Sequence, residues 1–197
     1  MYISRRMAIA AAVLLPLRPA FASEIKPKLR PPGALPEGDF LARCNRCQRC
    51  IQVCETRCVF PASFVHGITA VNTPVVSFKD SYCNSCLKCS LTCPTGALEP
   101  VTKGTLHIGI ALIVEKDCVA WDWIGCTICV DKCPLKAIYL DEQKRPVVLP
   151  EKCNGCGICQ HECPSTSLRT SITGKGVIVV PRGPDVPAME EHDGQAV

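Results

Sequence analysis

The chain has 197 residues, 17 of them cysteine, and only 5% are aromatic. A chain so poor in large rings has limited apolar area for a core, so metal ligation, which is coupled to folding, is a strong candidate for holding it together. The formal net charge of +4 is too small to favour a nucleic-acid-binding protein.

The first 22 residues have the form of an export signal. Residues 4–6 (Ser-Arg-Arg) precede an apolar stretch over residues 8–17, and residues 20–22 (Ala-Phe-Ala) form an A-x-A cleavage site. The paired arginines predict the twin-arginine route, with an ordinary Sec signal as the alternative. We therefore expect a mature chain that starts near Ser23 and resides in the bacterial periplasm. No other stretch is long and apolar enough to cross a membrane.

Four segments are predicted after the signal. Residues 23–40 are rich in proline and indicate an extended leader that packs along the surface. Residues 41–105 and 106–180 each hold two cysteine motifs and are predicted to be ferredoxin-like cluster units. Residues 181–197 are expected to form a flexible tail.

Sixteen cysteines fall into four copies of one pattern, and three copies close on Cys-Pro. The copies are Cys44, Cys47, Cys50 and Cys54; Cys83, Cys86, Cys89 and Cys93; Cys118, Cys126, Cys129 and Cys133; and Cys153, Cys156, Cys159 and Cys163. The pattern C-x2-C-x2-C-x3-C-P is the ligand spacing of bacterial ferredoxins. Sixteen thiolates are enough for four [4Fe-4S] clusters, with the same sixteen cysteines as the iron ligands.

In this spacing the fourth cysteine of a motif ligates the cluster of its partner motif. Adjacent pairing would give the first cluster Cys93 as its fourth ligand and the second cluster Cys54. The third and fourth clusters would likewise take Cys163 and Cys133. A nested pairing of outer with inner motifs is the alternative.

The repeats extend beyond the cysteines and account for the seventeenth, Cys58. Ala97, Ala137 and Ser167 stand four places after a fourth ligand, and Cys58 occupies the same slot in the first repeat. We therefore interpret Cys58 as a free thiol, with an alternative fourth ligand as the competing interpretation.

Short β-rich segments precede the later motifs, at residues 75–78, 110–114 and 147–149. Residues 141–146 predict a hairpin turn. A short helix is expected directly after each Cys-Pro, because proline favours a first helical turn. The predicted fold is α+β: two tandem bacterial-type (8Fe) ferredoxin-like domains with short strands and helices and low regular secondary structure.

Other chemistry has less support. Zinc ribbons also use C-x2-C pairs, but they need two pairs per ion rather than triplets closed by Cys-Pro. Trp121 and Trp123 lie in an insertion between Cys118 and Cys126. We expect them to pack over that loop, with a docking surface or a shield against water as the alternative. No nucleotide-binding loop or hydrolase signature is visible, so no catalytic residues and no independent catalysis are predicted.

A twin-arginine leader, the segment Leu-Arg-Pro-Pro-Gly-Ala over residues 29–34 and four cluster motifs resemble the NapG/MauM family of periplasmic ferredoxin-type proteins. Two features depart from the family pattern. Glu55 stands where the proline of Cys-Pro is usual, and the second motif has the short ferredoxin spacing where a longer one is often seen. The resemblance implies a membrane-bound, quinol-oxidising iron–sulfur partner of the NapH kind. Electrons would pass to a periplasmic cytochrome or reductase.

These observations together predict an exported electron-transfer protein with four [4Fe-4S] clusters. It would act in the periplasm, either free or peripheral at the inner membrane, as the electron-transfer component of an oxidoreductase system. The alternative is a tightly bound iron–sulfur subunit of a molybdenum-containing oxidoreductase complex.

Overall fold

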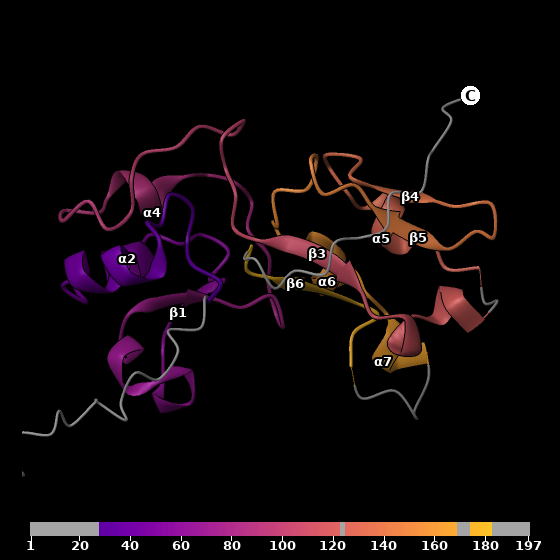
Figure 1. Ribbon diagram of the computed structural model, residues 1–197, viewed down its shortest axis with the longest axis horizontal. Helices are drawn as coiled ribbons and strands as arrows, with labels where there is room; N and C mark the ends of the chain where they lie inside the picture. Colours follow the sequence, from indigo (N-terminus) through magenta and orange to yellow (C-terminus); the bar gives the residue numbers. More distant parts are fainter. Residues whose placement is uncertain (1–27, 123–124, 169–173, 183–197) are drawn as a thin grey trace, which may run out of the picture.

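The computed structural model describes residues 28–122, 125–168 and 174–182. Figure 1 shows two lobes side by side, the first half of the chain forming one and the second half the other. The predicted signal at residues 1–22 and most of the predicted tail lie outside the described residues. Within the described ranges, no helix is both long enough and apolar enough to span a bilayer.

Short elements make up the first lobe. They are α2 (Glu37–Arg43), α3 (Arg49–Gln52), β1 (Val59–Pro61), the 3₁₀ turns η1 (Phe64–His66) and η2 (Ile68–Ala70), β2 (Pro74–Val76) and α4 (Lys88–Leu91). Strands β1 and β2 pair antiparallel, with Val59 opposite Val76. A strand is thus confirmed in this region, but it covers Pro74–Val76 rather than the expected residues 75–78.

The second lobe is likewise built from short elements. It contains β3 (Ile110–Ile113), η3 (Glu115–Asp117), η4 (Val119–Asp122), α5 (Ile128–Asp131), β4 (Ile138–Leu140), β5 (Pro146–Val148), α6 (Ile158–Glu162), α7 (Ser165–Leu168) and β6 (Val177–Val180). Strand β3 pairs antiparallel with β6, which brings the two ends of the lobe together. Strands β4 and β5 form the predicted hairpin, whose turn includes Lys144 at φ 60°. The predicted α+β character with low regular secondary structure is confirmed.

The expected helices after Cys-Pro are wrong for the second and third motifs. Their short helices lie earlier, around the third cysteine of each motif, while the residues after Cys93 and Cys133 form turns. Gly96 (φ 69°) and Lys136 (φ 49°) adopt left-handed backbone at the third position after these cysteines, which stops a helix. The chain then becomes extended and pairs with another segment. After the second motif, Leu98 forms a β-bridge with Ala34, and after the third motif the chain continues into β4. Only the fourth motif has a helix after its Cys-Pro, namely α7.

Residues 28–40 of the proline-rich leader pack against the first lobe, and residues 30–32 are buried there, whereas residues 23–27 lie outside the described residues. Pro31 and Pro32 are among the most deeply buried side chains, and Arg30 is 5% exposed. Gly33, at φ 81°, passes so close to the chain that an added Cβ would lie 2.0 Å from the carbonyl oxygen of Glu99. Only glycine fits there. The leader thus forms one wall of the first lobe.

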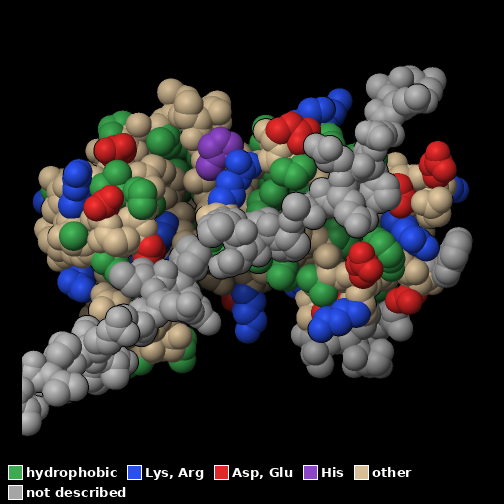
Figure 2. Space-filling model, in the orientation of Figure 1, with side chains coloured by type: hydrophobic (Ala, Val, Ile, Leu, Met, Phe, Trp, Pro, Cys, Tyr) green, Lys and Arg blue, Asp and Glu red, His purple; other side chains and the backbone are tan. Residues whose placement is uncertain are grey.

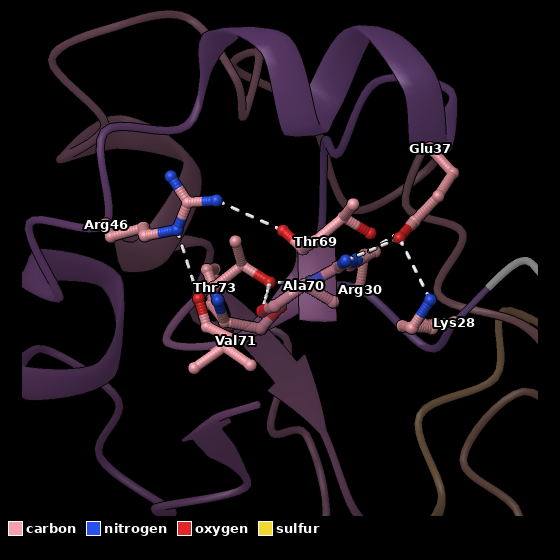
Figure 3. A network of polar contacts seen from close by, with 9 residues as sticks. Lys28, Arg30, Glu37, Arg46, Thr69, Ala70, Val71 and Thr73 are labelled. Atoms are coloured by element: carbon pink, nitrogen blue, oxygen red, sulfur yellow. Dashed lines mark hydrogen bonds and ion pairs between the residues drawn. The ribbon is translucent and has the colours of Figure 1, made fainter. Parts of the chain in front are cut away.

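A network centred on Arg30 fixes the leader in this position (Figure 3). The Arg30 guanidinium donates from Nε and Nη2 to the two carboxylate oxygens of Glu37, at 2.9 and 2.6 Å. Its Nη1 donates to Thr73 Oγ1 at 2.8 Å and to the carbonyl of Pro74 at 2.7 Å. The same group lies 4.4 Å from the ring centroid of Phe40. Leader, α2 and β2 are therefore joined through one buried side chain.

The two lobes share one hydrophobic core. The largest cluster of buried residues includes Val59 and Phe78 from the first lobe and Ile110 and Val177 from the second. The Phe78 ring lies against Gly157, where an added Cβ would be 2.1 Å from a ring carbon. A backbone hydrogen bond of 2.8 Å, from the amide of Cys83 to the carbonyl of Cys156, crosses the same junction. The lobes are thus held in a fixed relation.

We predict that Arg30→Ala lowers the apparent free energy of unfolding by about 3 kcal/mol, because it leaves the largely buried carboxylate of Glu37, whose side chain is 10% exposed, without its main partner. Anaerobic urea titration followed by circular dichroism measures the change. Arg49→Ala, at an exposed arginine, is the control and should shift stability by less than about 0.5 kcal/mol. Equal effects of the two substitutions would contradict the anchoring role of Arg30.

Candidate metal centres

The cysteine side chains gather around four separate cavities. The first is lined by Cys44, Cys47, Cys50 and Cys93; the second by Cys54, Cys83, Cys86 and Cys89, with Cys58; the third by Cys118, Cys126, Cys129 and Cys163; and the fourth by Cys133, Cys153, Cys156 and Cys159. Each cavity thus takes three cysteines from one motif and the fourth from the adjacent motif. This is the adjacent pairing, and the nested alternative is not what the chain adopts.

The thiols of each set surround a cavity and do not converge on one position. Throughout the described part of the chain, no three His, Cys, Asp or Glu side chains approach closely enough to hold a single metal ion. Sulfur is the donor that iron–sulfur clusters use, and four thiolates complete the ligand set of a [4Fe-4S] cluster. The residues around the cavities therefore fit this group.

Left-handed backbone turns the first cysteines of a motif toward the cavity. In three motifs the residues directly before and after the second cysteine have positive φ; these are Arg46 and Gln48, Ser85 and Leu87, and Gly155 and Gly157. Arg46, Gln48, Ser85 and Leu87 pay a steric penalty that glycine avoids. The third motif keeps Gly125 at φ 67°, whereas Thr127, after its second cysteine, has φ −120°. Its long insertion thus changes the loop.

An asparagine braces each of these three loops, a role that the cysteine spacing did not reveal. The side-chain oxygen accepts a hydrogen bond from the backbone amide of the second cysteine, at 3.3 Å for Asn45, 3.2 Å for Asn84 and 3.1 Å for Asn154. A turn closed by an asparagine side chain in this way holds the backbone locally without help from secondary structure. The recurring sequence Cys-Asn-x-Cys could have indicated it.

The third cysteine of each motif lies on a short helix and points into the protein. Cys50, Cys89, Cys129 and Cys159 are all buried. Burial, and to a smaller extent the neighbouring thiols, raises the pKa of Cys50 and of Cys129 to about 12. Without metal these thiols therefore keep their protons at neutral pH. Cluster assembly must release those protons, so binding is coupled to deprotonation.

Backbone amides point at several sulfurs. The amide of Leu98 lies 3.4 Å from the sulfur of Cys93, and that of Ala137 lies 3.2 Å from the sulfur of Cys133. Burial alone would raise the pKa of Cys93, but hydrogen bonds from the nearby backbone amides, that of Leu98 foremost, and from the Thr95 hydroxyl hold it below its ordinary value. Hydrogen bonds of this kind stabilise thiolates and contribute to the reduction potential of a cluster.

The four cavities form a single row. Helix α3 packs beside α4, so that Cys50 of the first cavity and Cys89 of the second interact electrostatically. The Cys83–Cys156 hydrogen bond joins the second cavity to the fourth. Helix α5 then packs beside α6 and brings the fourth cavity next to the third. The order along the molecule is first, second, fourth, third.

Two residues singled out in the sequence, Glu55 and Trp121, make contacts with other parts of the chain. Glu55 accepts a hydrogen bond from Asn84 Nδ2 at 2.9 Å and forms an ion pair with Lys88, so it ties the first motif to the second. In the third motif, the guanidinium of Arg145 lies 4.5 Å from the ring centroid of Trp121. Trp121 thus contacts the turn between β4 and β5. Trp123 lies outside the described residues.

Comparisons with known proteins agree with the cysteine geometry. The 4Fe-4S dicluster domain family matches residues 124–167, and the 4Fe-4S binding domain family matches residues 41–57 and 80–96. The methylamine utilization ferredoxin-type protein MauM of Methylophilus methylotrophus is 35% identical over 164 residues, covering 76% of this chain and 71% of that protein. The ferredoxin-type protein NapG of Escherichia coli K12 is 31% identical over 173 residues, or 79% and 74% of the two chains. NapF of the same strain is 30% identical over 144 residues, or 71% and 82%.

We predict that Asn154→Ala weakens the loop of the fourth cavity by about 1 kcal/mol, because it removes the acceptor for the Cys156 amide. The measurement is the midpoint of thermal loss of cluster absorbance under anaerobic conditions. Asn154→Asp keeps an oxygen acceptor and should behave more like the original protein. An unchanged midpoint in Asn154→Ala would show that the asparagine does not brace the loop.

Proposed function

Because the chain belongs to the ferredoxin-type NapG/MauM family of iron–sulfur electron-transfer proteins, we propose that it is a periplasmic relay with four [4Fe-4S] clusters. The two lobes would then be tandem 8Fe ferredoxin-like domains. The observation that supports this most directly is the row of four cysteine-lined cavities, each with thiols from two motifs. The sixteen cysteines of the four motifs would be the ligands.

The chain's own residues would hold and tune the redox centres. A bound [4Fe-4S] cluster takes up and releases electrons at a potential set by its hydrogen bonds and exposure. The buried helical cysteines and the apolar cavity walls limit water, and the amides of Leu98 and Ala137 point at ligand sulfurs. Among the described cysteines, only Cys47 is exposed. The first cavity is therefore the end of the row that a redox partner can approach most closely.

The proposed partners follow from the family. A membrane-bound, quinol-oxidising iron–sulfur protein of the NapH kind would supply electrons, and a periplasmic cytochrome or reductase would receive them. Nucleic acid is not a proposed partner. On the face shown in Figure 2, positive and negative side chains are interspersed over both lobes, and no large patch of one sign is visible.

The competing candidate is a tightly bound iron–sulfur subunit of a molybdenum-containing oxidoreductase. One observation favours this candidate: the apolar side chains of Phe64 and Val65 on η1 are 77% and 89% exposed, as expected of a surface that contacts another protein. Gel filtration of native extract separates the two candidates. Elution as a free small protein supports the relay, whereas stable co-elution with a large molybdenum subunit supports the complex.

We predict that the anaerobically purified protein contains about sixteen iron and sixteen sulfide per chain. Cys89→Ala should lose about four of each, since it removes a buried ligand of the second cavity, while Cys58→Ala should keep all four clusters. Iron and acid-labile sulfide assays measure both quantities. Zinc without sulfide in the original protein would exclude the proposed function.

Export is tested separately, because it depends on the signal rather than on the cavities. The double substitution Arg5→Lys with Arg6→Lys should block appearance of the folded protein in the periplasmic fraction, because the twin-arginine route recognises the arginine pair. Cell fractionation and immunoblotting measure the distribution. Normal export of the double variant would instead indicate a Sec signal.

A further inference from the structure

The second cavity has one thiol more than the other three. Cys58 lines it together with the four predicted ligands of the second cluster. The side chain is buried, at 2% exposed, and its sulfur lies 3.7 Å from the sulfur of Cys54. It also interacts with the thiol of Cys83 on the opposite motif. Cys58 is thus in contact with two predicted ligands of the same cluster.

The repeats show that this extra sulfur replaces a methyl group. Ala97 and Ala137 occupy the same place in the second and third motifs, and each is 1% exposed. A left-handed residue precedes the slot in all three motifs, namely Arg57, Gly96 or Lys136. The backbone of the first motif therefore follows the common path. Only the side chain at this position differs, and it brings a potential iron ligand to the cavity wall.

Cys54 nevertheless keeps the position of a fourth ligand. Its sulfur interacts with the backbone amide of Val59, just as the sulfur of Cys93 does with the amide of Leu98. A cubane with four irons takes four thiolates, so Cys58 is in excess while Cys54 is bound. A ligating thiolate can only accept a hydrogen bond. In the Cys54–Cys58 contact, the S–H must then belong to Cys58.

We propose that Cys58 serves the second cluster in two ways: it donates its S–H to a ligand sulfur while Cys54 is bound, and it supplies the fourth thiolate when Cys54 is absent. This inference rests on the proposed four-cluster function. Both sulfurs line one cavity, so the change of ligand requires a side-chain movement rather than a new backbone path. An exchange in the intact protein breaks the iron–sulfur bond of Cys54, forms that of Cys58 and moves one proton to Cys54. No electron is transferred and no oxidant is needed.

The test compares the two fourth ligands of the first lobe. Cys54→Ala has the reserve thiol Cys58 beside it, whereas Cys93→Ala has only Ala97. We expect Cys54→Ala to retain about sixteen iron per chain and Cys93→Ala to fall to about twelve. Cys54→Ala with Cys58→Ala should also fall to about twelve. Anaerobic iron and sulfide assays, with electron paramagnetic resonance spectra of the reduced proteins, provide the readout.

A gain-of-ligand variant protects the test against simple loss of folding. Adding Ala97→Cys to Cys93→Ala rebuilds the reserve position in the second motif, and it should restore about sixteen iron. Equal iron loss in Cys54→Ala and Cys93→Ala, or no recovery with Ala97→Cys, would overturn the role as a reserve ligand. If the original protein itself holds fewer than four clusters, the proposed function fails rather than this inference.

The donor role has its own readout in the intact ligand set. Cys58→Ala should lower the reduction potential of the second cluster, because it removes a hydrogen bond to a ligand sulfur that stabilises the reduced form. Cys58→Ser keeps a hydroxyl donor and should remain closer to the original potential. A redox titration followed by paramagnetic resonance measures both. An unchanged potential in Cys58→Ala would contradict donation.

Discussion

The fold depends on one constraint: the fourth cysteine of each motif faces the cavity of the adjacent motif. Cys54 lines the second cavity and Cys93 the first, so neither set of four thiols is complete without both motifs. The crossing places α3 against α4 in the first lobe and α5 against α6 in the second. In a chain with 5% aromatic residues, this exchange accounts for much of the organisation that a larger apolar core would supply. It also explains why buried thiols with raised pKa values are tolerated, since iron binding replaces their protons.

The same constraint supports the proposed relay. Paired cavities lie side by side within each lobe, and a backbone hydrogen bond from Cys83 to Cys156 links the lobes between the second and fourth cavities. Packing of Phe78 against Gly157 keeps this junction close, because an added Cβ at Gly157 would lie 2.1 Å from the Phe78 ring. The row of cavities therefore has two ends, in the first and third motifs, and a joined interior. Such an arrangement is what the proposed stepwise electron transfer requires.

Much of the metal chemistry could be predicted from spacing, because three cysteines at intervals of three residues require a tight loop around one centre. The slot of Cys58 could also be predicted, because it follows from the repeats, and so could the hairpin between Ile138 and Val148, because its turn sequence at residues 141–146 is local. The pairing of motifs was not, because adjacent and nested arrangements satisfy the same spacing. The helices were expected on the wrong side of Cys93 and Cys133, where left-handed residues and strand pairing prevail over the preference of proline for a first helical turn. Burial of Arg30 in the proline-rich leader depends on Glu37 and Thr73, which spacing alone did not connect.

The central claim is that four clusters lie in one row, in the order first, second, fourth and third motif. Anomalous scattering from a crystal of the anaerobic protein, recorded at the iron absorption edge, tests this most directly. The account predicts four separate iron sites in that order, with each site bounded by cysteines of two adjacent motifs. Fewer sites, a different order, or a site bounded by the cysteines of a single motif would contradict it.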